Sequence, residues 1–244
     1  MARLTLVRID NYVIDSPDDW RLELTAATQR LLGDTITLGD ADWQVLTSLP
    51  GWTRAHVATH LAFQAEALAA MANQLRVPDA VVAWRTSQSD TDLHVGARRG
   101  ALQLLEALDV SSATLMRALD ALDDEAWART VTTSQGVLPA VSLVVARLNE
   151  VVLHHIDLRL SLDFGDVDPR LARILLQWNL FRCTPRFTQV RLRVITDEGY
   201  SATIGKGPTT TVRGAESAVL AWLTGRRDAS AVLGAEDLDL NGPL

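Results

Sequence analysis

The chain has 244 residues, of which 48% are hydrophobic and 22% are charged, and its formal net charge is −7. This composition is typical of a folded protein with a substantial core, and the net negative charge argues against a broad nucleic-acid-binding surface. No apolar run approaches the roughly 18 residues that a membrane-spanning helix needs, so we expect neither a nucleic-acid nor a membrane partner. The single cysteine, Cys183, cannot form an internal disulfide, and residues 1–10 lack a secretory-signal pattern. We therefore expect a cytoplasmic protein.

The first two thirds of the chain are predicted to be helical. Apolar residues recur there at helical spacing, interrupted by polar connections around residues 41–43, 86–90 and 132–136. The turn residues Pro50 and Gly51 precede the second helix, and Pro139 is expected to open the fourth. The four predicted helices cover residues 17–32, 55–75, 95–122 and 139–160.

Beyond about residue 163 the pattern changes to one of short helices and strands. Alternating apolar and polar residues predict the strands, and Gly225 marks the end of the last helix. We expect helices at 170–178 and 214–224 and strands at 190–194, 200–204 and 209–213. The predicted fold is therefore mainly α with a small α+β part: a bundle of four helices in residues 1–163, followed by a small α/β domain in residues 164–244.

Polar residues in the fourth predicted helix point to a metal site. Glu150 and His154 are four residues apart, so on a helix both side chains lie on one face. A histidine from the second helix would complete a His₂Glu set, which suits zinc with one open coordination position. His60 is the candidate, although spacing alone leaves His56 open as well. The alternative is that Glu150 pairs with Arg147 and that the histidines are ordinary core residues.

Further candidate residues surround this predicted centre. Asp157 is placed to orient a ligand histidine or else to lie on the helix surface. Arg147 is a candidate for binding a cofactor through an anionic group. Arg226 and Arg227 follow a helix end, from which a guanidinium can hold a substrate carboxylate. The sequence has no phosphate-binding glycine loop, dinucleotide fingerprint or Gly-x-Ser-x-Gly turn, which argues against nucleotide chemistry and serine hydrolysis.

Three segments together carry a resemblance to a known family. They are Leu-Pro-Gly-Trp-Thr-Arg-Ala-His-Val-Ala-Thr-His-Leu-Ala at 49–62, Thr-Ser-Gln-Gly at 133–136 and Arg-Leu-Asn-Glu-Val-Val-Leu-His-His-Ile-Asp-Leu at 147–158. The chain resembles the mycothiol-dependent maleylpyruvate isomerase family of the DinB-like superfamily over nearly its whole length. The resemblance implies a DinB-like four-helix domain joined to a small α/β domain, and zinc bound by His60, Glu150 and His154. It also implies that Arg226 contacts the substrate.

The resemblance further implies an enzyme with mycothiol as cosubstrate and a small electrophilic, carboxylate-bearing substrate. In such an isomerase a thiolate adds to the double bond of maleylpyruvate, the bond rotates, and elimination gives fumarylpyruvate. Two departures from the family pattern stand at Gln64, where an asparagine is usual, and at residues 88–92, where an arginine usually precedes an acidic stretch. The alternatives are therefore a mycothiol S-transferase and a non-catalytic metal-binding or thiol-sensing module.

Overall fold

The structure, a computed structural model, describes residues 17–85, 88–236 and 238. Residues 1–10, on which the expected absence of a secretory signal depends, and residues 86–87 of a predicted loop lie outside the described residues. Contacts within the chain divide it into two units, one ending at Leu160 and one beginning at Ser161. This boundary lies close to residue 163, where the sequence predicts the change of domain.

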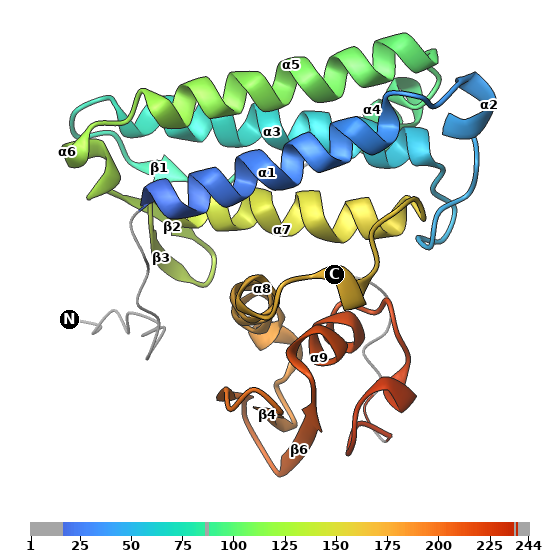
Figure 1. The fold of residues 1–244 in the computed structure, drawn as a ribbon. Helices are drawn as coiled ribbons and strands as arrows, with labels where there is room; N and C mark the ends of the chain where they lie inside the picture. The colour runs from blue at the N-terminus through green and yellow to red at the C-terminus, as the bar shows by residue number, and fades with distance from the viewer. Residues whose placement is uncertain (1–16, 86–87, 237, 239–244) are drawn as a thin grey trace. The chain divides into compact units, whose positions relative to one another are not determined.

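The first unit is mostly helical, and its four long helices pack against one another. Helix α1 contacts α5 and α7, and α3 also contacts α5 and α7. Figure 1 shows the four running alongside one another. Their inward faces form the apolar core, with leucines such as Leu61, Leu115 and Leu148 almost fully buried. The helices of this unit are α1 (Pro17–Thr35), α2 (Asp40–Trp43), α3 (Arg54–Leu75), α4 (Asp90–Gly96), α5 (Ala101–Asp120), α6 (Asp124–Trp127) and α7 (Ser142–Asp157).

The predicted third helix, 95–122, is in fact two helices, α4 and α5. The chain between them turns through Arg98 and Arg99, and Gly100 is extended (φ −71°, ψ 165°) at the start of α5. The backbone N–H of Ala101 donates to a carboxylate oxygen of Asp40 at 2.6 Å. Asp40 belongs to α2, which occupies the connection predicted to be irregular around residues 41–43. A contact between distant segments therefore fixes where α5 begins.

A small sheet occupies the region predicted as a loop at 132–136. Its strands are β1 (Val82–Ala83), β2 (Thr130–Thr133) and β3 (Gly136–Pro139), with β1 parallel and β3 antiparallel to the central β2. Gly136, at φ +133°, allows the tight turn between β2 and β3. Pro139 ends β3 rather than opening a helix, and α7 begins three residues later, at Ser142.

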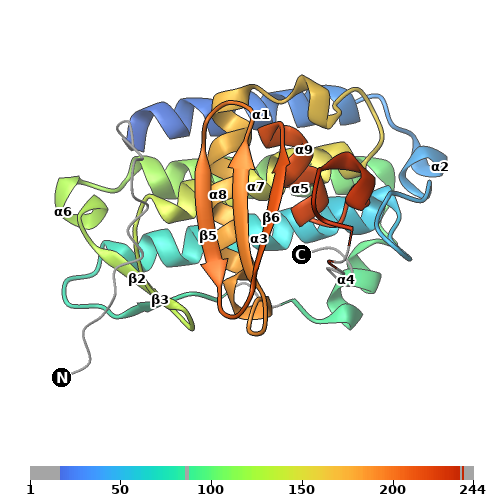
Figure 2. The ribbon, with the colours of Figure 1, turned by 90° about the horizontal axis from the view of Figure 1, so that it is seen from below.

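The second unit combines a three-stranded sheet with two helices. Strand β4 (Arg191–Thr196) lies between β5 (Ser201–Gly205), to which it is antiparallel, and β6 (Thr209–Gly214), to which it is parallel. Figure 2 shows the three strands side by side. Helix α9 (Glu216–Leu223) contacts α8 (Pro169–Cys183), β4 and β6. Short 3₁₀ helices lie at Phe164–Asp166, Thr184–Arg186 and Ala229–Ala231.

The fold shows where the single cysteine lies. Cys183, at the end of α8, is buried, and burial raises the pKa of its thiol to about 12, as suits a core residue.

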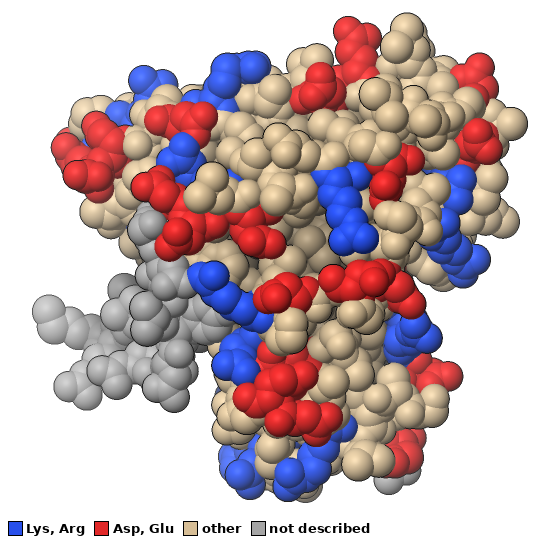
Figure 3. Space-filling view, viewed as in Figure 1, with Lys and Arg blue, Asp and Glu red and all other residues tan. Residues whose placement is uncertain are grey.

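On the face drawn in Figure 3, acidic and basic side chains are interspersed. Within the described residues, every helix is too short or too polar to cross a bilayer. The expected lack of a nucleic-acid partner and the cytoplasmic location stay predictions.

Candidate metal centre

The start of α3 is fixed by the turn that precedes it. The N–H of Trp52 donates to the carbonyl of Leu49 at 3.1 Å, and Gly51 takes the positive φ (+77°) that this turn requires. The N–H of Thr53 then donates to Nδ1 of His56 at 3.2 Å, so the imidazole caps the first turn of the helix. His60 follows one turn later on α3. The turn residues of the motif therefore set the position from which His60 projects.

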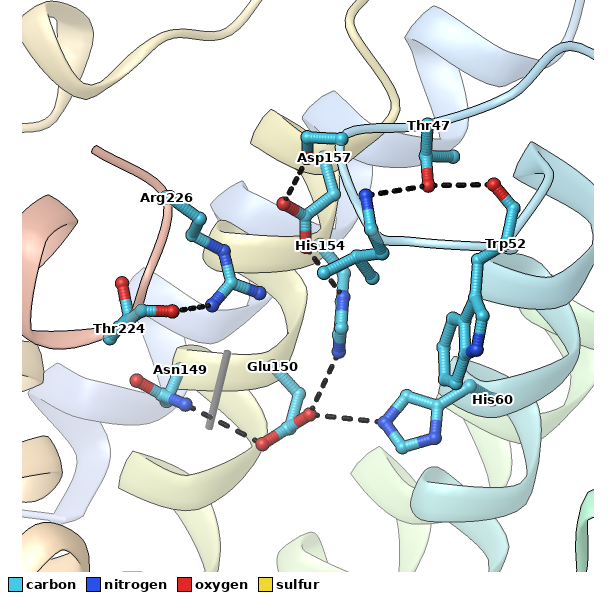
Figure 4. A network of polar contacts seen from close by, with 11 residues as sticks. Thr47, Trp52, His60, Asn149, Glu150, His154, Asp157, Thr224 and Arg226 are labelled. Atoms are coloured by element: carbon cyan, nitrogen blue, oxygen red, sulfur yellow. Dashed lines mark hydrogen bonds and ion pairs between the residues drawn. The ribbon is translucent and has the colours of Figure 1, made fainter. Parts of the chain in front are cut away.

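The structure brings His60, Glu150 and His154 together (Figure 4). Oε2 of Glu150 lies 3.2 Å from Nε2 of His60 and 3.2 Å from Nε2 of His154. His60 comes from α3, whereas Glu150 and His154 lie one turn apart on α7. One ligand atom from each residue lies within 4.8 Å of the others, and this is the one such group of three found among the described residues.

The two separations that involve Glu150 fit the edges of a tetrahedral zinc site. Zinc–nitrogen and zinc–oxygen bonds of about 2.0–2.1 Å at tetrahedral angles place neighbouring ligand atoms about 3.3 Å apart. The two distances of 3.2 Å to the Glu150 oxygen are close to that value. Three protein ligands leave one coordination position for an exogenous atom. The donor set and its spacing therefore suit a divalent metal that retains an open site.

Asp157 orients one of these three side chains. Its carboxylate lies 2.9 Å from Nδ1 of His154 and accepts a second hydrogen bond from Oγ of Ser48 at 2.7 Å. Because Asp157 is completely buried, this carboxylate is not the helix-surface group that the sequence left possible. A proton on Nδ1 leaves the lone pair of Nε2 directed at the centre. Burial alone lowers the pKa of His154, but the hydrogen bonds and charges of Asp157 and Glu150 outweigh it and raise that pKa.

The other histidines face different partners. Nδ1 of His56 is engaged with Thr53, and its Nε2 lies 2.9 Å from Nδ1 of His94. His94 belongs to α4, although it precedes the helix predicted at 95–122. Nε2 of His155 lies 2.8 Å from a carboxylate oxygen of Asp34 on α1. The geometry therefore places His60, and not His56, beside Glu150 and His154, and its role as a metal ligand stays a prediction.

Trp52 belongs to this site, although residue patterns did not mark it as a candidate. Its ring stacks on that of His154, with centroids 6.3 Å apart and an interplanar angle of 17°, and it also lies 5.5 Å from His60. The indole is half-buried and forms an apolar wall beside both imidazoles (Figure 4). The sequence signal that could have marked Trp52 as a site residue is its place directly before the cap residue Thr53. The turn that positions His60 also positions this ring.

Arg147 lies on α7, one turn before Glu150, and is 1% exposed. Its guanidinium donates to the carbonyl of Leu61 at 2.7 Å, to Oε1 of Gln64 at 2.8 Å and to Oγ of Ser112 at 3.1 Å. These bonds join α7 to α3 and α5, and they do not include the direct pairing with Glu150 that the sequence allowed. Binding of a cofactor by Arg147 stays a prediction.

Arg226 and Arg227 lie in the second unit, after α9. Gly225 takes a positive φ of +73° at the helix end, and Nη1 of Arg226 donates to the carbonyl of Thr224 at 3.1 Å. Arg227 pairs with Asp163 at 3.3 Å. The structure thus gives the local geometry of the predicted substrate-binding arginine, and a contact of Arg226 with substrate stays a prediction.

Comparison with known proteins identifies the family. A family model described as the mycothiol maleylpyruvate isomerase N-terminal domain matches residues 24–159, more than half of the chain. No protein of curated function matches the sequence.

Two solved structures resemble the fold. The crystal structure of a mycothiol-dependent maleylpyruvate isomerase aligns with a TM-score of 0.76 over 87% of this chain and 90% of that chain. A variant of mycothiol-dependent maleylpyruvate isomerase with one histidine replaced by alanine aligns with the same score over 88% and 91%. Both are 21% identical to this sequence, so they show the shared fold. The family match confirms the resemblance carried by the three motifs: the chain belongs to the mycothiol maleylpyruvate isomerase N-terminal domain family.

Proposed function

We propose that this protein is a zinc-dependent enzyme of the maleylpyruvate isomerase type that uses mycothiol as cosubstrate. The observation that carries the proposal is the convergence of His60, Glu150 and His154 from two helices at a spacing that suits a tetrahedral ion. The family match supports the thiol and the reaction class. The helices α1, α3, α5 and α7 are proposed to form a four-helix bundle that holds the ion.

Each residue of the centre has a role in this proposal. A bound zinc ion lowers the pKa of a coordinated thiol, so that a thiolate is available at neutral pH. His60, Glu150 and His154 hold the ion, while Asp157 keeps His154 in the tautomer that directs Nε2 toward it. The indole of Trp52 shields the His60 and His154 rings from water on one side.

The reaction is a cis–trans isomerisation without net change in composition. The thiolate sulfur forms a bond to one carbon of the activated double bond of maleylpyruvate, and the electron pair moves into the conjugated carbonyl. Rotation then occurs about the resulting single bond. Return of the electron pair breaks the carbon–sulfur bond, releases the thiolate and gives fumarylpyruvate. Arg226 is proposed to hold a substrate carboxylate in bidentate fashion during these steps.

The test begins with the metal content of the purified protein, followed by mixing with mycothiol and maleylpyruvate and recording product absorbance. An isomerase turns over many substrate molecules for each thiol, and the free thiol concentration stays constant. Consumption of one thiol per product would instead establish an S-transferase, for which the departure at residues 88–92 leaves room. A protein that binds metal but shows no thiol-dependent turnover, neither isomerisation of maleylpyruvate nor transfer of the thiol to an electrophile, would be a binding or sensing module.

A further inference from the structure

Arg147 is a buried cation whose hydrogen-bond partners are all neutral. Its three acceptors are a backbone carbonyl, a glutamine side chain and a serine hydroxyl. Within the described part of the chain, no carboxylate lies within ion-pair distance of this guanidinium. Arginines that are almost fully buried are usually paired with an acidic group, because an isolated charge is costly to remove from water. The arrangement therefore calls for a role beyond joining helices.

The position of Arg147 places its charge next to the candidate metal centre. Positions 147, 150, 154 and 157 recur at helical spacing and lie on one face of α7. The carbonyl that accepts from Nη1 of Arg147 belongs to Leu61, which adjoins the ligand His60. Burial lowers the pKa of Arg147 to about 10, partly offset by the negative charge of Glu150. The guanidinium is therefore charged at neutral pH.

The charges of Arg147, Glu150, Asp157 and a bound divalent ion add to a positive total. Glu150 and Asp157 contribute two negative charges, and Arg147 contributes one positive charge. A divalent ion held by neutral imidazoles brings the total to +1. Because these groups are buried or half-buried, the excess charge acts through a medium that screens poorly. A positively charged centre favours an anion at its open coordination position over a neutral molecule.

We propose that Arg147 makes the metal-loaded centre selective for an anionic fourth ligand, such as a thiolate, without touching that ligand. The inference deepens the proposed function and rests on it, since it requires that His60, Glu150 and His154 hold a divalent ion. The role of Arg147 is then electrostatic: its charge favours the deprotonated form of the thiol over the neutral thiol or water.

The structure offers an isosteric change that cancels this charge. Oε1 of Gln64 already accepts from Arg147 at 2.8 Å, so Gln64→Glu would place a carboxylate against the guanidinium with almost no change in shape. Arg147→Met removes the charge outright, and Arg147→Lys retains it. Gln74→Glu is the matched control, because it adds the same charge to the same helix at an exposed position roughly 15 Å further along α3.

The readout is ligand binding to the cobalt-substituted protein, followed by its visible absorption spectrum. Thiocyanate serves as the anionic probe and imidazole as the neutral one, and the ratio of their affinities is compared between variants. For Gln64→Glu and Arg147→Met we expect this ratio to fall about tenfold, the scale for a unit charge about 10 Å away at an effective dielectric constant of about 20. Arg147→Lys and Gln74→Glu should keep the ratio of the unaltered protein.

The possible results separate this inference from the proposed function. If the protein binds cobalt but Gln64→Glu leaves the ratio unchanged, the electrostatic role of Arg147 is wrong and the metal centre stands. If thiocyanate and imidazole affinities fall together in Gln64→Glu, Arg147 acts only by holding the helices in place, which also contradicts the inference. A protein that binds no cobalt contradicts the metal centre itself.

Discussion

The carboxylate of Asp157 lies 2.9 Å from Nδ1 of His154, where it can accept a hydrogen bond from the ring nitrogen that faces away from Glu150. Asp157→Asn retains an acceptor but removes the charge. We expect metal affinity to fall about 10- to 100-fold, as is usual when a partner of a ligand histidine is altered. Competition with a chromophoric chelator measures this change. Asp109→Asn, an exposed change on α5, should have no effect, and equal affinity in both variants would exclude the orienting role.

Replacement of a single histidine tests which one is the ligand from α3. His60→Ala should lose most of the bound metal, because it removes one of three ligand atoms around a shared position. His56→Gln should retain full metal content, since the His56 ring is engaged with Thr53 and His94. Elemental analysis of both variants after dialysis shows which of the two histidines holds the metal. Loss of metal from the His56 variant, with retention in the His60 variant, would reverse the assignment.

His56 gives the metal-free protein a defined dependence on pH. Burial lowers the pKa of His56 below its ordinary value of 6.5, and the charge of His94 lowers it further. The unfolded chain therefore takes up a proton at this position more readily than the folded chain, and stability falls as the pH drops below about 6.5. Above that pH the contribution is fully present. The helix cap agrees with this direction, because Nδ1 must stay unprotonated to accept from the N–H of Thr53.

His56→Gln is the matched variant for this prediction, because glutamine at this helix position also accepts from the cap N–H but does not titrate. Urea unfolding in the presence of a chelator should give a free-energy difference between the two proteins that changes from pH 7.5 to pH 5, in favour of the variant at the lower pH. A difference that stays constant over this range would show that the pKa of His56 is the same in the folded and unfolded chains.

Arg226 is predicted to act on the substrate and not on the metal. Loss of a charge-assisted bidentate contact in Arg226→Ala should lower kcat/KM with the thiol and substrate about 10- to 100-fold while metal content stays the same. Arg227→Ala, which removes only an exposed pair with Asp163, is the control for charge at this helix end. Equal kinetics in the two variants would show that Arg226 is only a helix-terminal cation.

The contact between α3 and α4 depends on a glycine. A Cβ at position 96 would lie 2.3 Å from Cγ2 of the buried Thr59, so Gly96→Ala should destabilise the protein by about 1–3 kcal/mol. Gly33→Ala in α1 is the contrasting change, because no atom lies within 4 Å of its added Cβ. That variant should gain about 0.5–1 kcal/mol from helix propensity. Thermal unfolding of both compares them directly, and a stable Gly96→Ala variant would contradict the tight packing.

Local spacing predicted the long helices and two members of the candidate metal group, because both follow from the period of an α-helix. Glu150 and His154 needed only their separation of four residues to be placed on one face. Spacing could not separate His60 from His56. In the structure the side chain of His56 turns back to the helix cap and toward His94, which lies 38 residues away. No periodicity reports such a contact.

Other differences between the predicted and the observed structure also arise from what periodicity does not report. The break before α5 depends on the bond from Ala101 to Asp40, which are 61 residues apart. The strand pair at 130–139 was missed because β2 and β3 have only four residues each, and the turn signal at Gly136 also fits a loop. Arg147 was interpreted from its charge alone, whereas its burial against α3 and α5 arises from the packing of three helices.

His60 and Glu150 are ninety positions apart in the chain, yet one ion would be bound by both. Such an ion is a removable cross-link between α3 and α7, and only the folded chain offers it all three ligands. By mass action, its binding energy adds to the free energy of unfolding. Metal supply would then govern the lifetime of the protein as well as its chemistry, and the metal-free form would be the first to be degraded.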